Sequence, residues 1–132
     1  MNILSNYVTE CLVRASVSCH LDQLAQKDIS GRVFAEKLVR AVDIAKATPR
    51  RAVTHNKGIM NGIDAVILAT GNDFRAVEAG IHAYASKDGQ YSSLTHATIE
   101  DNVFKMWIEI PLALGWLLYP SEAADDLPRV DP

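Results

Sequence analysis

The chain has 132 residues, of which 48% are apolar, and a formal net charge of −3 at pH 7. This length suits one modest domain that buries a core only when its elements pack together. Acidic and basic residues are interspersed, which excludes the basic patch of a nucleic-acid-binding protein. The longest apolar run near the end, residues 110–119, is interrupted by Pro111 and Gly115 and is shorter than the roughly 20 residues of a membrane-spanning helix. We therefore expect neither nucleic-acid nor membrane partners.

The N-terminus shows neither the positive region nor the long apolar stretch of a secretory signal peptide. We therefore expect a cytoplasmic protein in which Cys11 and Cys19 are free thiols. The histidines lack the paired spacing of zinc ligands, so no metal site is predicted. His55 lies nearest to the polar stretch described below, where it is either a proton donor or simply a packing residue.

The first half of the chain predicts one strand and one long helix. Residues 3–10 have apolar side chains at helix-like spacing and predict a short turn or helix, and residues 12–19 alternate as in a half-buried strand. One or two helical turns follow the strand. Ser30 is a suitable N-cap for a longer helix, which Pro49 ends because a proline disfavours the helical conformation of the residue before it. The two arginines after Pro49 are expected in a loop.

The second half predicts more helix and then a hairpin. Residues 62–70 carry only one charge, Asp64, and predict a buried helix with Asp64 in its first turn. Asp73 opens the next helix. Residues 91–99 and 103–110 alternate and predict a β-hairpin, whose buried face would consist of Phe104, Met106, Ile108 and Ile110. The expected fold is α+β, helix-rich, with one early strand and a C-terminal hairpin.

Residues 50–75 separate polar from apolar side chains in the manner of a binding site. Polar residues gather around Gly58 and Gly62, where glycine permits positive φ and a close approach of ligand to the main chain. A charged lysine at 57 can stabilise a developing oxyanion, and an aspartate within reach keeps it charged. On the residues alone an alternative stays open. Asn-Lys-Gly can be a solvated turn, and Gly-Asn-Asp can be a helix stop followed by an N-cap.

Three segments together resemble one enzyme family. Residues 54–64 read Thr-His-Asn-Lys-Gly-Ile-Met-Asn-Gly-Ile-Asp, residues 69–73 read Ala-Thr-Gly-Asn-Asp, and residues 78–80 read Glu-Ala-Gly. This pattern resembles the bacterial class II hydroxymethylglutaryl-CoA (HMG-CoA) reductases, and the similarity runs from Ile3 to Gly115. The resemblance implies that residues 1–115 are part of the large catalytic domain. Residues 116–132 do not match, and their prolines and acids predict a disordered tail.

The resemblance also implies roles for five residues. Lys57 and Asp73 would be catalytic, with Lys57 holding the carbonyl oxygen as it gains charge and Asp73 keeping Lys57 in place and charged. Arg51 and Asn61 would contact the hydroxymethylglutaryl part of the substrate. Asn6 would lie near the lysine and the nicotinamide of the cofactor.

The family reduces HMG-CoA to mevalonate and CoA with NAD(P)H, in isoprenoid metabolism, and its active sites lie at the subunit boundary of a dimer. The resemblance therefore implies these ligands and a homodimer. We expect the main cofactor-binding domain, the glutamate acid and the histidine that protonates the CoA thiolate to lie outside this chain. The 132-residue chain alone is then expected to be inactive. The alternative is a noncatalytic interaction fragment that keeps the dimer-forming surface.

The spacing of the two predicted catalytic residues adds one expectation. If residues 58–71 form a single straight helix, its ends are roughly 20 Å apart, too far for a side-chain contact. We therefore expect Lys57 of one subunit to meet Asp73 of the other.

Overall fold

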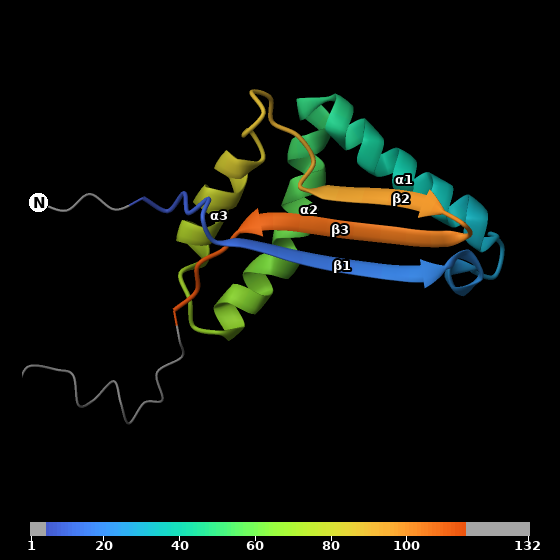
Figure 1. Cartoon of the computed structure of the whole chain (residues 1–132), viewed down its shortest axis with the longest axis horizontal. Coiled ribbons are helices and arrows are strands. Elements are labelled where there is room, and N and C mark those ends of the chain that lie inside the picture. The colour runs from blue at the N-terminus through green and yellow to red at the C-terminus, as the bar shows by residue number, and fades with distance from the viewer. Residues whose placement is uncertain (1–4, 116–132) are drawn as a thin grey trace, which may run out of the picture.

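The computed structural model describes residues 5–115, which form a three-stranded sheet packed against three α-helices (Figure 1). The elements, in chain order, are β1 (Leu12–His20), a 3₁₀ turn η1 (Leu21–Leu24), α1 (Gly31–Ala47), α2 (Pro49–Ala69), α3 (Phe74–Tyr84), β2 (Thr95–Glu100) and β3 (Val103–Pro111). The sheet is antiparallel with the order β1-β3-β2. This confirms the predicted α+β class, the early strand and the hairpin.

The hairpin between β2 and β3 closes through a two-residue turn. Asp101 and Asn102 both have positive φ, 48° and 62°, as a type I′ turn requires. The strand β2 begins at Thr95, so the first part of the predicted run is loop. On β3, Phe104 and Ile110 are buried. The alternation of the sequence therefore identified the face of β3 that meets the helices.

The core has two parts, which share the sheet. The first joins α1 to β2 and β3 and consists of Leu21, Ala35, Val42, Ala97 and Phe104. The second joins α2 and α3 to β3 and consists of Met60, Ile81, Ala85, Leu94 and Ile110. The helix α1 begins as predicted, because the Oγ of Ser30 accepts a hydrogen bond from the backbone N of Val33 (3.4 Å). It ends at Ala47, before the extended Thr48 that precedes Pro49.

The strand β1 was predicted to be half-buried, and this was wrong. Val13 and Val17 are 42% and 66% exposed, although their partners Ile110 and Met106 belong to the core. The strand β1 is an edge strand on the other side of β3 from β2, and α2 passes behind it in Figure 1 without covering its apolar side chains. A mainly apolar groove of about 320 Å³ is lined by side chains of β1, β3 and α2, among them Ala15, Val17, Ile59, Ile63, Met106 and Ile108.

Two other predictions concern the ends of the chain. Residues 5–8 are irregular and Thr9 and Glu10 form a turn, so of the turn or helix predicted for residues 3–10 the described part contains the turn; residues 3 and 4 lie outside the described part. The predicted disordered tail, residues 116–132, also lies outside it. Cys11 and Cys19 are free, as predicted. Within residues 5–115, no helix is both long and apolar enough to cross a membrane.

Candidate functional site

The polar stretch of the sequence lies on one long helix, α2. Pro49 occupies its first turn, where a missing N–H removes no hydrogen bond, so the proline begins a helix as well as ending the previous one. The loop predicted for Arg50 and Arg51 is therefore wrong, because both belong to the first turn of α2. Asp64 lies in the second half of this helix and not in the first turn of a shorter one.

Gly58 and Gly62 are both helical. The prediction that a ligand approaches the main chain closely at Gly58 and Gly62 relied on positive φ at these glycines. Among the described glycines, positive φ is found at Gly71 and Gly89 instead. The alternative of a solvated Asn-Lys-Gly turn is wrong as well. A Cβ built on Gly58 or Gly62 would meet nothing within 4 Å, so the two glycines leave open surface beside Lys57. A ligand could therefore approach the helix backbone here without any unusual φ.

The second half of α2 is less buried than predicted. Ile67 is 1% exposed, but its neighbours Val66 and Leu68 are 59% and 57% exposed. Only one side of the helix contacts α3 and the sheet within the described residues. An apolar composition thus did not distinguish a buried helix from one with a single covered side.

The predicted site residues of α2 lie on its open side. Arg51, Lys57 and Asn61 are all exposed. Lys57 and Asn61 are four residues apart and share one face of the helix, whereas Arg51 lies about 120° around the axis from Lys57. The helix brings the lysine and the asparagine together and leaves the arginine about 9 Å further along the axis.

A buried asparagine fixes the rotation of α2. Asn56 is completely buried, its Nδ2 donates to the carbonyl O of Ser92 (2.9 Å), and its Oδ1 accepts from the backbone N of Leu94 (3.0 Å). The two bonds tie the helix to the segment that enters β2. Because Lys57 is the next residue, the same bonds determine where Lys57 points. Sequence reasoning assigned no role to Asn56. The signal that could have identified it is its spacing: Ala52, Asn56 and Met60 are four residues apart, so the asparagine shares a helix face with two apolar residues.

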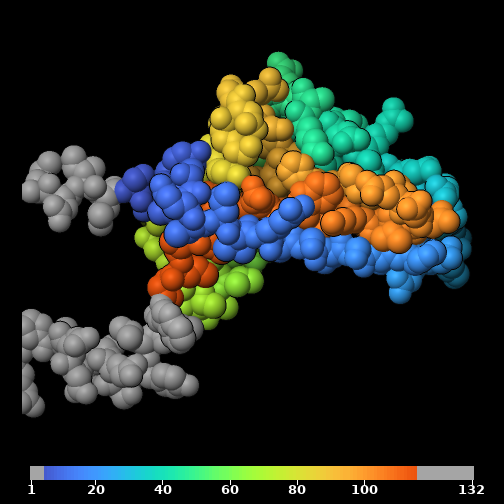
Figure 2. Space-filling model, viewed as in Figure 1, coloured from blue at the N-terminus to red at the C-terminus, as the bar shows by residue number. Residues whose placement is uncertain are grey.

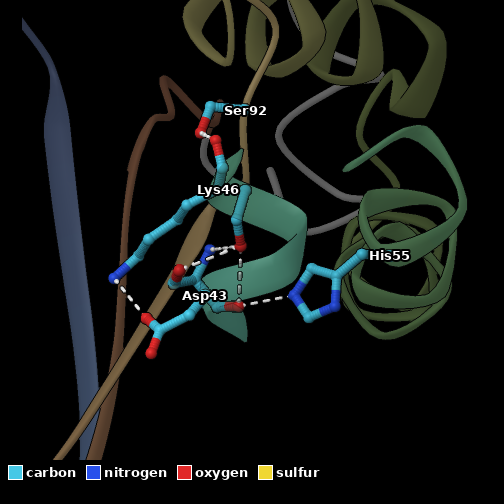
Figure 3. A network of polar contacts seen from close by, with 6 residues as sticks. Asp43, Lys46, His55 and Ser92 are labelled. Atoms are coloured by element: carbon cyan, nitrogen blue, oxygen red, sulfur yellow. Dashed lines mark hydrogen bonds and ion pairs between the residues drawn. The ribbon is translucent and has the colours of Figure 1, made fainter. Parts of the chain in front are cut away.

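His55 points into this same contact rather than toward Lys57. Its Nε2 lies 2.7 Å from the Oγ1 of Thr95 (Figure 3). Residues two apart on a helix project about 160° from each other, so His55 and Lys57 face nearly opposite ways. Burial, and secondly the charge of Arg51, lower the pKa of His55. These observations favour the packing role for His55 over that of proton donor.

The corner between α2 and α3 carries Asp73. Gly71, with φ of 70°, ends α2, and the Oδ1 of Asp73 accepts from the backbone N of Arg75 (3.0 Å) and of Ala76 (3.1 Å). The predicted helix stop and N-cap are confirmed. Because both bonds use Oδ1, the second carboxylate oxygen can accept from another donor, so a cap and a catalytic role are compatible.

Asn72 joins this corner to the end of β3. Its Nδ2 donates to the carbonyl O of Thr70 (3.1 Å), and its Oδ1 accepts from the backbone N of Gly115 (3.0 Å). The chain beyond β3 is therefore held beside Asp73.

Asn6 lies near the start of α3, the helix that Asp73 caps. It lines a small pocket of about 170 Å³ with Ala76 and Val77, in the first turns of α3. A Cβ on Gly80 would lie 2.4 Å from the carbonyl O of Asn6, so the N-terminal segment lies directly on α3. Figure 2 shows this segment, in blue, against the end of the molecule where the chain leaves β3.

The five predicted residues thus fall into separate places. Asn6 and Asp73 lie near the start of α3, Lys57 and Asn61 share a face of α2, and Arg51 lies near the start of α2. From residue 57 to the end of α2 the helix rises about 18 Å.

Comparison with known proteins gives the family. The family model described as hydroxymethylglutaryl-coenzyme A reductase matches residues 1–117. The chain belongs to the HMG-CoA reductase family. It is 42% identical over 115 residues to the 3-hydroxy-3-methylglutaryl-coenzyme A reductase of Archaeoglobus fulgidus, covering 87% of this chain and 25% of the relative. It is 40% identical over 115 residues to the probable reductase of Borreliella burgdorferi, covering 87% of this chain and 27% of that relative.

Comparison with solved structures gives the same family. A reductase of Streptococcus pneumoniae superposes with a TM-score of 0.77 at 50% identity, covering 83% of this chain and 30% of that one. A class II reductase of the same organism, bound to NADPH in open conformations, superposes with a TM-score of 0.78 at 48% identity. The match again covers 83% of this chain and 30% of that one. The resemblance to class II enzymes is confirmed. The chain spans about a quarter of the curated relatives it matches.

Proposed function

We propose that this segment supplies part of the active site of a cytoplasmic HMG-CoA reductase that converts HMG-CoA and NAD(P)H to mevalonate and CoA. The observation that carries the proposal is the exposed face of α2 on which Lys57 and Asn61 lie together, next to the buried and hydrogen-bonded Asn56. A lysine held by a rigid helix is preorganised to stabilise the oxyanion that develops on the thioester carbonyl. Membership of the family supports this assignment.

The other residues would bind and orient the ligands. Arg51 would hold the carboxylate of the hydroxymethylglutaryl group, and Asn61 would hydrogen-bond the same group near Lys57. Asn6 would contact the nicotinamide end of the cofactor. The pocket at Asn6, about 170 Å³, is smaller than the roughly 300–1,000 Å³ of ordinary ligand pockets. These residues therefore fit only one end of a dinucleotide, whose bound form supplies the hydride.

The proposed site is shared between two subunits. The continuous helix α2 separates Lys57 from the α2–α3 corner by about 18 Å along its axis, so a homodimer would pair Lys57 of one subunit with Asp73 of the other. A two-fold interface would create two equivalent sites of this kind. Asp73 would keep Lys57 charged and in position through its second carboxylate oxygen.

The first experiment separates chemistry from binding. In a complete reductase carrying this segment, Lys57→Ala should lower kcat about 10²- to 10³-fold, because a positioned oxyanion stabiliser is lost. Arg51→Ala should mainly raise KM. Arg50→Ala is the matched control for removal of one exposed arginine from the same turn. Equal effects of the Lys57 and Arg51 variants on kcat and KM would mean that the two roles are wrongly assigned.

The second experiment tests the shared site. A Lys57→Ala subunit is coexpressed with an Asp73→Ala subunit, and mixed dimers are isolated with two affinity tags. Each parent dimer should be inactive, and mixed dimers should regain one working site of two. Verified mixed dimers without activity would place both residues in one subunit's site.

A second candidate is a noncatalytic chain that associates with another reductase subunit. The exposure of β1 and the apolar groove of about 320 Å³ beside it favour this candidate. The purified chain is mixed with NADPH and HMG-CoA, and cofactor oxidation is followed at 340 nm. Turnover that depends on HMG-CoA would exclude the noncatalytic chain, whereas no turnover together with binding to an intact subunit would support it.

A further inference from the structure

The side chain of Asn72 links two parts of the chain that are distant in sequence. Its Nδ2 donates to the carbonyl O and to the Oγ1 of Thr70, each at 3.1 Å. Its Oδ1 accepts from the backbone N of Gly115 (3.0 Å), 43 residues further along the chain. An asparagine in a turn ordinarily bonds to backbone groups close to it in sequence. The bond to Gly115 therefore exceeds what the turn after α2 requires.

The amide of Asn72 is anchored to the end of α2. Besides the bonds to Thr70, the backbone N of Asn72 donates to the carbonyl O of Ile67 (3.0 Å), and the residue is half-buried. An amide carries its donor and its acceptor on two different atoms, so one end can hold the turn while the other holds a distant segment. Figure 1 shows that segment, in orange-red after β3, running beside the corner between α2 and α3.

The segment after β3 forms part of the pocket at Asn6. Residues 111–113 line this pocket of about 170 Å³ together with the first turns of α3. The start of the segment is held by β3 and by the backbone N of Leu112, which donates to the carbonyl O of Cys11 (2.8 Å). Within the described part of the chain, residues 113–115 make no hydrogen bond other than the one to Asn72. The far end of the pocket wall therefore depends on this asparagine.

We propose that Asn72 is a positioning residue, which holds Gly115 and so fixes residues 111–115 as a wall of the pocket at Asn6. Without this bond the wall would be held at one end only. The cap that the next residue, Asp73, makes on α3 uses its own Oδ1 and does not need the amide. Loss of the amide should therefore change the pocket and leave the cap in place. The consequence for the reaction rests on the function proposed above, in which this pocket takes the nicotinamide end of the cofactor.

The hold on Gly115 can be tested in the chain itself by removing either partner. Asn72→Ala removes the acceptor, and Gly115→Pro removes the N–H that donates. Gly115→Ala is the matched control, because it keeps the N–H and its Cβ would lie 3.7 Å from the Oδ1 of Asn72, an ordinary contact. The ¹⁵N order parameters of residues 113 and 114 should fall from about 0.85 to below about 0.6 in the first two variants and stay unchanged in the control. Combining Asn72→Ala with Gly115→Pro should add little, because both remove the same bond.

The role in binding is tested in a complete reductase that carries this segment. Asn72→Ala and Gly115→Pro should raise the KM for NAD(P)H about three- to tenfold, which corresponds to the loss of one hydrogen bond. The kcat and the KM for HMG-CoA should stay within about twofold. A merely structural role would instead reduce the amount of folded enzyme, and with it kcat, without changing either KM. Urea unfolding of each variant measures any such loss of stability.

Two results would overturn the proposal. One is unchanged order parameters of residues 113 and 114 in the Asn72→Ala chain. The other is an unchanged KM for NAD(P)H in that variant when Asn6→Ala raises it, since the pocket would then bind the cofactor without help from Asn72. If neither variant raised this KM while the order parameters fell, the assignment of the pocket to the cofactor would fail, and the hold of Asn72 on Gly115 would stand.

Discussion

Replacing Asn56 with alanine should greatly reduce the stability of the chain. Asn56 is completely buried, and its amide makes two hydrogen bonds, to Ser92 and Leu94. Alanine leaves a buried backbone N–H and a partly buried carbonyl without partners, at about 1–3 kcal/mol each, and creates a small cavity. We expect a loss of about 3–5 kcal/mol in the free energy of unfolding. That is a large part of the roughly 5–15 kcal/mol of an ordinary domain.

The assay is urea unfolding followed by circular dichroism, with the midpoint and the m-value fitted separately. A lower midpoint with an unchanged m-value would show lost stability without a change in the surface exposed on unfolding. Asn61→Ala is the matched control, because it makes the same change on the exposed side of the same helix. It should alter stability by no more than about 0.5 kcal/mol. An Asn56→Ala loss below about 1 kcal/mol, or equal losses for both variants, would refute the reasoning.

Further predictions concern other contacts of α2 and α3. Gly80→Ala should displace the N-terminal segment, because the new Cβ would lie 2.4 Å from the carbonyl O of Asn6. The free energy of unfolding should fall by about 1–3 kcal/mol, and amide hydrogen exchange around residue 6 should become faster. Gly58→Ala, where a Cβ meets nothing within 4 Å, should instead stabilise α2 by about 1 kcal/mol in thermal unfolding, and a loss would contradict the open surface described here. His55 has a lowered pKa, so the unfolded chain takes up its proton first and stability should fall as pH drops below about 6.5. His55→Gln should reduce this acid sensitivity, and an unchanged profile would count against the lowering of the His55 pKa by burial and Arg51.

The sequence predicted elements best where one local signal acts alone. Ser30 capped a helix and the alternating residues after 103 formed a strand, because caps and period-two patterns depend on neighbours in the chain. Pro49 was misinterpreted because proline stops one helix and is equally favourable in the first turn of another. The alternation of β1 gave its two faces, but whether Val17 is covered depends on how closely α2 packs against β1, and a groove separates the two.

The site residues were predicted by a resemblance to a family and not by local sequence patterns. Lys57 and Asp73 were assigned by family resemblance, since a lysine and an aspartate near glycines are weak signals by themselves. Asn56 lies within the polar stretch of residues 54–64, but its burial depends on a contact with a loop far along the chain.

The position of β1 in the sheet has a consequence for the order of folding. β1 pairs with β3 and with no other strand of the described sheet, and His20 lies opposite Val103 and Leu12 opposite Pro111. Almost the whole described chain therefore lies between the two partners. Helices and the β2–β3 hairpin can form from local contacts, whereas closing such a long loop carries an entropic cost that slows the process. During synthesis on the ribosome, β1 emerges before β3 and stays unpaired until β3 has followed, which exposes a strand rich in apolar residues to association with other chains.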